Sequence, residues 1–506
     1  MIMNQWIDGL WMLLPVLLSA ASGVGLLLSR HKEGQDGAQS KKRLHLLVGA
    51  VLFLAAMLAV TAAWGGEKSL TLFYVMDDIP IYFHVDALGK LFVTLTSVIW
   101  TAVGIYAFVY MEHEGKERRF FGFYLLVYGV LLALEFAGNL ITFYFFYELM
   151  TLTSMPLVMH NGSKEAILAA LKYLFYSMCG AYCALFGIYV LYQYCDTLTF
   201  TTGGVLNMTL ASENSGVLQI AVFLMLIGFG TKAGMLPFHS WLTAAHPAAP
   251  APASAALSSI IVKGGVLAII RTVYYIVGPA FLKGTWVQTA WMVLSLVTVF
   301  MGSMLAYREK VFKKRLAYST VSQVSYILFG LSLCTDTAVS GALLHVVFHA
   351  CIKCALFLTA GIFIFRTGKT RVEEYVGIGK SMKVTLWCYT FASLALIGIP
   401  PMSGFISKWY LAQGALQADV GIFAIAGPVV LLLSALLTAG YLLPITIKGF
   451  LLGETAARGN LGMEEKKEPM DKMTVVLLVL AVLTVLFGVL PNPLITYVSG
   501  IAASLL

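Results

Sequence analysis

Residues 224–236 read LMLIGFGTKAGML, and residues 394–406 read LALIGIPPMSGFI. Both stretches lie in long apolar runs, and both follow an LIG triplet with a residue that weakens a helix two positions later. That residue is Gly230 in the first stretch and Pro400 in the second. A second glycine comes at the same offset in both copies. The predicted architecture depends on this repeated interruption of an apolar run.

The composition shows in what environment these runs lie. The chain has 506 residues, of which 59% are hydrophobic and only 11% are charged. A soluble protein of this size could not cover its surface with so few charged side chains. Apolar stretches of about 20 residues, each able to cross about 30 Å of hydrocarbon, recur along the whole sequence. We therefore expect an all-α polytopic membrane protein.

Hydropathy predicts about fourteen transmembrane helices. The expected spans are 6–29, 43–64, 87–110, 119–136, 138–159, 165–193, 217–238, 253–275, 285–306, 316–334, 340–364, 384–412, 422–447 and 473–498. The first run has no basic segment before it and no cleavage site after it, so it is predicted to be a retained span.

The basic residues predict the orientation. If both termini lie outside, only Lys68, Lys90, Arg271 and Lys283 fall outside or at outer ends of spans. The other loop lysines and arginines all fall inside, as the positive-inside rule requires. The net charge of +8 then needs no nucleic-acid partner. The prediction is a multi-pass protein of the cell (plasma or inner) membrane with both termini on the outer side.

Five lysines remain, and all of them lie within predicted spans. They are Lys172, Lys232, Lys263, Lys353 and Lys408. Only two acids, Glu135 and Glu148, share that position. A lysine in the middle of a membrane costs a few kcal/mol at least, so it is normally functional or paired. One such lysine could extend its side chain so that the ammonium group reaches the membrane–water interface, but five together favour an ion path.

The two opening stretches are one of two matching pairs. AALKYLFYSMCG at 169–180 and ACIKCALFLTAG at 350–361 also share an alanine, a lysine, an aromatic residue and a glycine in register. Each pair links one five-helix unit to the next. Because five is an odd number of membrane crossings, two consecutive units must have opposite orientations in the membrane. This arrangement predicts inverted repeats with discontinuous helices that face a hydrated interior. The alternative is a kinked helix whose glycines serve close packing.

A second constellation lies in LLHVVFHACIKCALF. His345, His349 and Lys353 recur at i, i+4 and i+8, on one stripe of a helix. Two imidazoles and a lysine can pass protons by short hops. Metal binding is the alternative, but no cysteine or carboxylate partners cluster there. The seven cysteines follow no disulfide or iron–sulfur pattern.

Glu148, in GNLITFYFFYELMTLTS, is the second acid within a span. An unpaired carboxylate there would be neutral, whereas near Lys232 both groups could stay charged, with coupled protonation. The chain has no hydride, phosphate or flavin motif. We therefore expect no cofactor, no metal and no redox chemistry in this chain.

Four segments carry a resemblance to a known family. They are GTKAGMLPFHSWLTAAHPAAPAPASAALSSIIVKGG, KKRLAYSTVSQVSY, LLHVVFHACIKCALFLTAG and LIGIPPMSGFISKWYLAQGAL. They resemble the antiporter-like membrane subunits of respiratory complex I, Mrp-type Na⁺/H⁺ antiporters and membrane-bound group 4 hydrogenases. The match covers nearly the whole chain and is densest from about 138 to 450. The sequence at 245–254, AHPAAPAPAS, resembles the Mrp D-type and hydrogenase subunits more than those of complex I.

The resemblance implies fourteen helices, with two inverted five-helix repeats formed by helices 4–8 and 9–13 and with helices 7 and 12 broken. The implied parts are 1–118 (helices 1–3), 119–275 and 276–450 (the repeats), and 451–506 (a loop and helix 14). It also implies a polar axis across the middle of the membrane. Carried over by motif, the ion path comprises Glu148, Lys232, Lys263, His345, His349, Lys353 and Lys408. Further candidates are Lys172, Glu135, His239 and His246.

Within that path, Glu148 and Lys232 are the coupling pair, Lys263 and the His345 stripe form the centre, and Lys408 serves the outlet. The chain departs from the family at Asn139, where many relatives have an acid, which leaves no role predicted there. No long lateral helix is expected after helix 14.

The predicted function is translocation of protons, or exchange of H⁺ with Na⁺, in a multisubunit ion-pumping complex. The expected complex is Mrp-like or of the membrane-bound hydrogenase type, and a complex I subunit is the alternative. The expected partners are other membrane subunits, including homologous ones, together with lipid. Two other classes stay open: a stand-alone transporter of an organic solute, and a structural subunit without activity.

Overall fold

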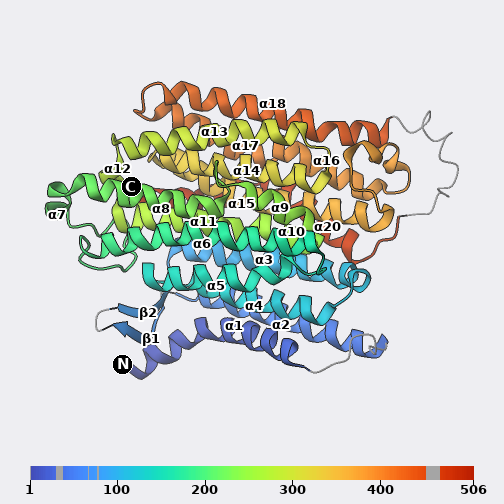
Figure 1. Ribbon diagram of the computed structural model, residues 1–506, viewed down its shortest axis with the longest axis horizontal. Helices are drawn as coiled ribbons and strands as arrows, with labels where there is room; N and C mark the ends of the chain where they lie inside the picture. Colours follow the sequence, from blue (N-terminus) through green and yellow to red (C-terminus); the bar gives the residue numbers. More distant parts are fainter. Residues whose placement is uncertain (1, 30–37, 67, 77–78, 452–467) are drawn as a thin grey trace. The chain divides into compact units, whose positions relative to one another are not determined.

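The computed structural model describes residues 2–29, 38–66, 68–76, 79–451 and 468–506, and these are helical almost throughout (Figure 1). Eleven helices in this part of the chain are long and apolar enough to cross a membrane. The predicted spans 119–136, 316–334 and 384–412 are not among them. The first two are helices with charged first turns, and the third is two shorter helices. The count of fourteen spans therefore stays a prediction.

The described chain falls into two compact units. Unit 1 comprises residues 1–229 and 267–278, and unit 2 comprises residues 230–266 and 279–506. The four-part division predicted from the sequence stays a prediction. Residues 452–467 of its last part, 451–506, lie outside the described residues.

Unit 1 holds the N-terminal helices. They are α1 (Ile2–Leu28), α2 (Ala38–Trp64), α3 (Ala87–Glu114), α4 (Glu117–Glu135), α5 (Leu140–Val158), α6 (Lys164–Tyr192), α7 (Met208–Glu213) and most of α8 (Ser215–Ala233). Helices α1 and α4 pack closely because small residues lie where they meet. A Cβ atom at Gly23 would collide with the backbone of Gly122, and one at Gly129 would collide with that of Val16. Small residues of this kind let membrane helices approach.

A short β-hairpin, which the sequence analysis did not predict, corrects the all-α assignment locally. Strands β1 (Ser69–Met76) and β2 (Ile79–His84) pair antiparallel between α2 and α3. The backbone N–H of His84 donates to the carbonyl of Phe136 at 2.8 Å, so the hairpin is attached to the end of α4. The alternating polar and apolar residues of the two strands lie between two predicted spans. A hydropathy search for transmembrane helices does not detect such a pattern.

Unit 2 is a helix bundle whose longest member is buried. Its elements are α9 (Ser240–Ala248), α10 (Ala251–Ala256), η1 (Leu257–Ile261), most of α11 (Val262–Ile270), α12 (Pro279–Leu282), α13 (Trp286–Arg308), α14 (Phe312–Ser332), α15 (Asp336–Thr367), η3 (Val372–Tyr375), η4 (Ile378–Lys380), α16 (Lys383–Ile397), α17 (Ser403–Gln417), α18 (Phe423–Phe450), α20 (Lys472–Val489) and α21 (Asn492–Leu505). Helix α15 contacts α14, α16, α17, α20 and α21, which explains why nearly all its side chains are buried. The predicted span 473–498 is instead two helices, because the chain turns at Leu490 and Pro491.

Both interrupted stretches are broken, but the first break lies four residues later than predicted. Helix α16 ends at Ile397 and α17 begins at Ser403, so the break predicted near Pro400 is confirmed. Helix α8 continues through Gly230 and ends at Ala233, so the break predicted at Gly230 is wrong in position.

The two breaks share one mechanism, the Schellman motif. Gly234 and Gly398 have φ angles of +83° and +92°, which glycine adopts without strain. At the first break, Met235 N–H donates to Gly230 O at 2.8 Å and Gly234 N–H donates to Thr231 O at 3.1 Å. The equivalent two hydrogen bonds, at 3.1 Å each, run from Ile399 and Gly398 to the carbonyls of residues 394 and 395. The first helix therefore ends at the glycine that can take a positive φ.

The run 251–277 is helical throughout but changes its hydrogen-bonding pattern twice. The segments η1 (Leu257–Ile261) and η2 (Arg271–Val277) are π-helical and flank α11. Short π segments occur frequently at functional sites. Hydropathy alone predicted one uninterrupted span at 253–275, since the π pattern has no hydropathy signal.

An ion pair in unit 1 holds η2 against the start of α3. Arg271 is 2% exposed and binds Asp86 through two hydrogen bonds, one of 2.8 Å between Nη2 and Oδ1. Its guanidinium lies 4.4 Å from the ring of Tyr275 and 4.6 Å from that of Phe200. Burial tends to raise the pKa of Asp86, but the charge and hydrogen bonds of Arg271 outweigh burial and lower this pKa to about 2. Asp86 also accepts from Gly89 N–H and so caps α3.

We predict that Asp86→Asn destabilises the purified protein by about 3–5 kcal/mol, because it leaves the Arg271 guanidinium buried without its anion. Asp86→Asn combined with Arg271→Met should recover part of the loss, since no charge stays buried alone. Thermal unfolding in detergent measures both effects. Equal unfolding temperatures for Asp86→Asn and the unsubstituted protein would refute the assignment.

The same pair predicts a pH dependence. The pKa of Asp86 is lower in the folded protein than its ordinary value of 3.8, so the pair stabilises the fold above about pH 4. This contribution, about 2 kcal/mol, should be lost as the pH falls towards 2. The loss should be absent from the Asp86→Asn variant.

Candidate functional site

The predicted stripe on α15 is present and buried. Helix α15 runs without interruption through His345, His349 and Lys353, so the spacing of four places their side chains on one line. None of the three is more than 1% exposed. Titratable groups so deep in an apolar bundle need hydrogen-bond partners, and these partners define the site.

Lys263 lies against the middle of this stripe. Its Nζ is 2.8 Å from Nδ1 of His349 and donates to the carbonyl of Ser258 at 2.8 Å. Ser258 belongs to the π segment η1, which directly precedes α11. The irregular turn thus supplies an acceptor for the lysine, while the imidazole lone pair supplies another. A proton on Nζ is therefore within direct transfer distance of His349.

The line continues from His349 to His345 and on to α17. The two imidazole rings are nearly stacked, with centroids 5.8 Å apart. Nδ1 of His345 is 2.9 Å from the hydroxyl of Ser407, and its ring stacks on Tyr326 at 5.6 Å. Nε2 of each histidine has no hydrogen-bond partner among the described residues. The step between the rings is longer than a hydrogen bond, so it requires a bridging water or a ring movement.

Lys408 ends the line at the second helix break. Its Nζ donates to the carbonyls of Leu396 at 2.5 Å and Ile397 at 2.9 Å, which are last-turn carbonyls of α16. It also lies 5.1 Å above the ring of Tyr326. The break that ends α16 therefore exposes carbonyl oxygens, and the lysine on α17 satisfies them.

Lys353 lies one turn beyond His349 in the other direction. Its Nζ donates to the carbonyl of Leu316 at 3.1 Å. His246, a further candidate, is 1% exposed and stacks on Phe357 at 4.6 Å, and neither ring nitrogen has a described hydrogen-bond partner. Lys313, counted in a loop from the sequence, is instead buried and donates to the carbonyls of residues 247 and 249.

Lys232 lies in the last turn of α8 and is fully buried. Its Nζ is 5.9 Å from the ring of Trp241, whose Nε1 donates to the carbonyl of Thr231 at 2.8 Å. A cation in the last turn of a helix is stabilised by the helix dipole. Glu148 is in α5 of unit 1, and its pairing with Lys232 stays a prediction.

The other candidates belong to other elements of the chain. Lys172 is exposed on α6. Glu135 is buried in unit 1 and accepts from the hydroxyl of Thr96 at 2.5 Å. His239 is half-buried in the first helix break, with its ring 6.2 Å from that of Tyr318. Asn139 caps α5 by accepting from Thr142 N–H at 2.7 Å, which is a structural task that needs no acid.

Sequence reasoning missed three groups that complete the line: the Ser258 carbonyl, Tyr326 and Ser407. Ser407 directly precedes Lys408, and Tyr326 ends the quoted segment KKRLAYSTVSQVSY. Polar residues of these types are common in membrane helices, so only their contacts distinguish them.

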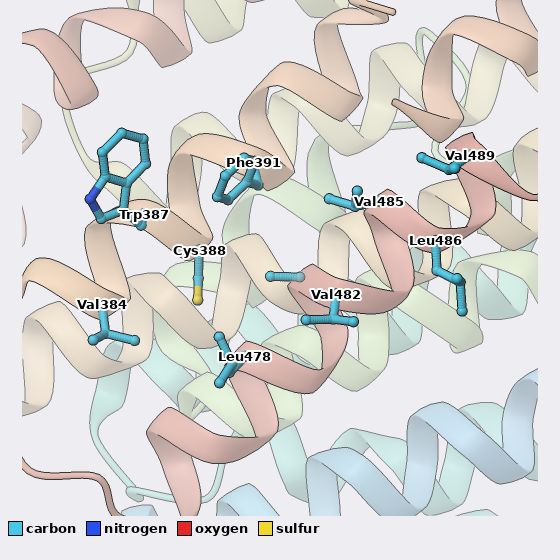
Figure 2. A pocket seen from close by; sticks show the side chains of 10 residues that line it. Val384, Trp387, Cys388, Phe391, Leu478, Val482, Val485, Leu486 and Val489 are labelled. Atoms are coloured by element: carbon cyan, nitrogen blue, oxygen red, sulfur yellow. The ribbon is translucent and has the colours of Figure 1, made fainter. Parts of the chain in front are cut away.

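An apolar groove between α16 and α20 is a separate feature (Figure 2). Side chains from Val384 to Phe391 face those from Leu478 to Val489 across it. Its lining holds no charged residue, so it provides no groups that bind ions.

The described features define a class of protein: a multi-pass helical membrane protein with a buried line of lysine and histidine side chains. Comparison with known proteins agrees with this class. Residues 137–436 match the family model described as "NADH:quinone oxidoreductase/Mrp antiporter, TM". Residues 74–121 match a model described as "NADH-Ubiquinone oxidoreductase (complex I), chain 5 N-terminus". The chain belongs to the NADH:quinone oxidoreductase/Mrp antiporter membrane-subunit family.

Curated relatives come from several kinds of complex. The chain is 33% identical over 413 residues to NADH-quinone oxidoreductase subunit N of Desulforudis audaxviator, covering 79% of this chain and 81% of the relative. It is 32% identical to hydrogenase-4 component B of Escherichia coli, covering 80% and 62%. It is 27% identical to the D-type subunit of the Na⁺/H⁺ antiporter of Alkalihalophilus pseudofirmus, covering 98% and 97%.

Solved structures share the fold. A chain of an archaeal membrane-bound sulfane sulfur reductase matches with a TM-score of 0.83 and 22% identity, covering 99% and 98% of the two chains. A chain of respiratory complex I from Thermus thermophilus matches with a TM-score of 0.79, also at 22% identity, covering 98% and 99%.

We predict that Lys408→Leu lowers the unfolding temperature by several degrees, because two carbonyls lose their donor at about 1–3 kcal/mol each. Lys408→Arg should lose less, since it keeps N–H donors. Lys314→Leu is the matched control, because Lys314 forms only a surface ion pair with Glu309 and should change stability little. Equal losses for Lys408→Leu and Lys314→Leu would contradict this account of the break.

Proposed function

We propose that this chain is the proton-translocating membrane subunit of a multisubunit ion-pumping complex. The observation that carries the proposal is the 2.8 Å contact between Nζ of Lys263 and Nδ1 of His349, two side chains that are at most 1% exposed. A donor and an acceptor held at this distance and away from bulk water are placed for direct proton transfer.

The proposed sequence of steps follows the contacts. A proton leaves the Lys263 ammonium for Nδ1 of His349, and the lysine becomes neutral. His349 then holds a proton on each nitrogen and can release the one on Nε2 towards His345. The Ser407 hydroxyl, 2.9 Å from Nδ1 of His345, can relay the proton towards Lys408. Lys353 extends the same stripe in the opposite direction and provides a second point of entry or exit.

Within this proposal, Glu148 and Lys232 act as the coupling pair and the two halves of the axis are inverted repeats. Both copies end a helix at a glycine with a positive φ, which supports the repeat, although Gly234 and Gly398 lie at different positions of the aligned segments. The burial of Lys232 at a helix end supports its role, because a cation held there responds strongly to a nearby change of charge. The fourteen helices and the outer position of both termini belong to the same proposal.

We infer an Mrp-antiporter-like or membrane-bound-hydrogenase type of complex. The D-type relative from a Na⁺/H⁺ antiporter, which is matched over nearly its whole chain, supports the antiporter type, and the 32% identical hydrogenase-4 component B supports the hydrogenase type. A complex I subunit is the second candidate, favoured by the 33% identical NADH-quinone oxidoreductase relative. Purifying the chain with its partners in mild detergent and identifying the other subunits separates the two. The transported ions are protons, with Na⁺ as the counter-ion in the antiporter case.

We predict that Lys263→Arg blocks transport nearly as completely as Lys263→Ala. Arginine keeps the positive charge, but its guanidinium does not release a proton to a neighbouring imidazole. Proton flux in inverted vesicles that contain the complex measures this, and recovery of the complex in unchanged yield is the control. Normal transport by Lys263→Arg with none by Lys263→Ala would show that the lysine acts as a fixed charge.

We predict that Lys232→Ala leaves the complex assembled and abolishes pumping or antiport, since the coupling pair loses its cation. Flux in the same vesicles measures the loss. Normal flux would remove Lys232 from the coupling pair. Transport of an organic solute by the chain expressed alone would favour a stand-alone transporter instead.

A further inference from the structure

One of the five lysines in predicted spans points outward. Lys172 is exposed on α6, whereas Lys232, Lys263 and Lys353 are at most 1% exposed. It is the ninth residue of this 29-residue helix, about 12 Å along the axis from the first residue. No carboxylate lies within ion-pair distance of it among the described residues, and its Nζ lies 5.9 Å from the centre of the Tyr176 ring.

The residues around Lys172 form one outward stripe, which we call the Lys172 face. It comprises Leu171, Lys172, Phe175, Tyr182, Phe186 and Tyr189, which follow the spacing of one helix side. Apart from the lysine, each is between 49% and 68% exposed. The opposite side of α6 is closely packed, because a Cβ atom at Gly187 would collide with Met225 of α8. The Lys172 face is therefore the side of α6 that unit 1 leaves uncovered.

Its chemistry does not match a surface that meets only lipid. Tyr182 lies about 15 Å from the last residue of α6, too deep for the interfacial belt, and its hydroxyl makes no described hydrogen bond. A charged ammonium and a phenol in the hydrocarbon region both cost free energy unless a partner satisfies them. Aromatic residues are also enriched where proteins meet one another.

Helix α18 provides the contrast within the same chain. Its outward residues Ile425, Val429, Leu432 and Leu436 are 49–67% exposed and purely aliphatic. Neither charge nor hydroxyl interrupts them, as expected for contact with lipid tails. The Lys172 face therefore carries an ammonium group and hydroxyl groups that need polar partners, whereas the outward side of α18 carries no such groups.

We propose that the Lys172 face docks a transmembrane helix of another subunit, and that this helix places a carboxylate opposite Lys172. The proposal rests on the proposed membership of a multisubunit complex and adds the surface and the chemistry of the contact. The carboxylate neutralises the ammonium, and the aromatic residues provide the packed area around the pair.

Charge variants of the tagged chain, expressed with its partner subunits, test the contact. Lys172→Glu should reduce the recovery of partner subunits at least tenfold, because two carboxylates would meet in an apolar interface. Lys172→Arg should retain most of the recovery. The amount of tagged chain in the membrane is the control for folding.

The native cysteine at position 179 provides a second measurement that needs no change in the face. Cys179 is exposed on α6 between Phe175 and Tyr182. In a Cys183→Ala/Cys195→Ala background, a membrane-permeant maleimide should label Cys179 several-fold less in the complex than in the chain expressed alone. Leu432→Cys on α18 is the matched control and should be labelled equally in both.

The outcomes separate the two proposals. If partners co-purify with Lys172→Glu as with the unsubstituted chain, and Cys179 is labelled equally in both states, the face meets lipid and this inference is overturned alone. If the unsubstituted chain purifies without any other subunit, or only with a second copy of itself, the proposed complex fails and this inference with it.

Discussion

A buried ammonium group must find an acceptor, and in unit 2 this requirement explains two irregularities of the backbone, the π segment η1 and the end of α16. Lys263 donates to a carbonyl of the π segment η1, and Lys408 donates to the last carbonyls of α16. A regular α-helix occupies its interior carbonyls with its own N–H groups, so carbonyls without such a partner arise where the helix stops or changes its pitch. The irregular turns and the lysines therefore depend on each other. The free carbonyl oxygens need hydrogen-bond donors, and the buried ammonium groups need acceptors.

The same requirement explains why the imidazoles lie where they do. A carbonyl cannot take a proton from a lysine, so a lysine bonded only to carbonyls needs a water molecule or a movement of its side chain to release its proton. His349 gives Lys263 an acceptor that can take the proton away, and His345 repeats this function one turn further along α15. Proton transfer across an apolar interior requires at least a chain of groups that can each accept a proton and release it again.

The sequence indicated these residues because charge in an apolar run is conspicuous. The lysines, the α15 stripe and the second break all followed from composition and spacing. The position of the first break did not, because three nearby glycines have different tasks. Gly228 lets α8 pack against Gly180, Gly230 leaves room for the Met235 side chain, and only Gly234 takes the positive φ. Packing and helix termination both use glycine, so composition alone cannot assign the roles.

Side-chain direction is the other property that spacing left open. Lys172 and Lys353 occupy matching positions in the aligned segments at 169–180 and 350–361, so the sequence pattern predicts the same environment for both. The structure buries Lys353 on α15, which helices cover on all sides, and exposes Lys172 on α6, which unit 1 covers on one side. Burial depends on the neighbours that a helix acquires, and local sequence does not encode those neighbours. Matching lysines on an internal helix and on an outer helix can therefore have different partners, since both positions demand that the charge be satisfied.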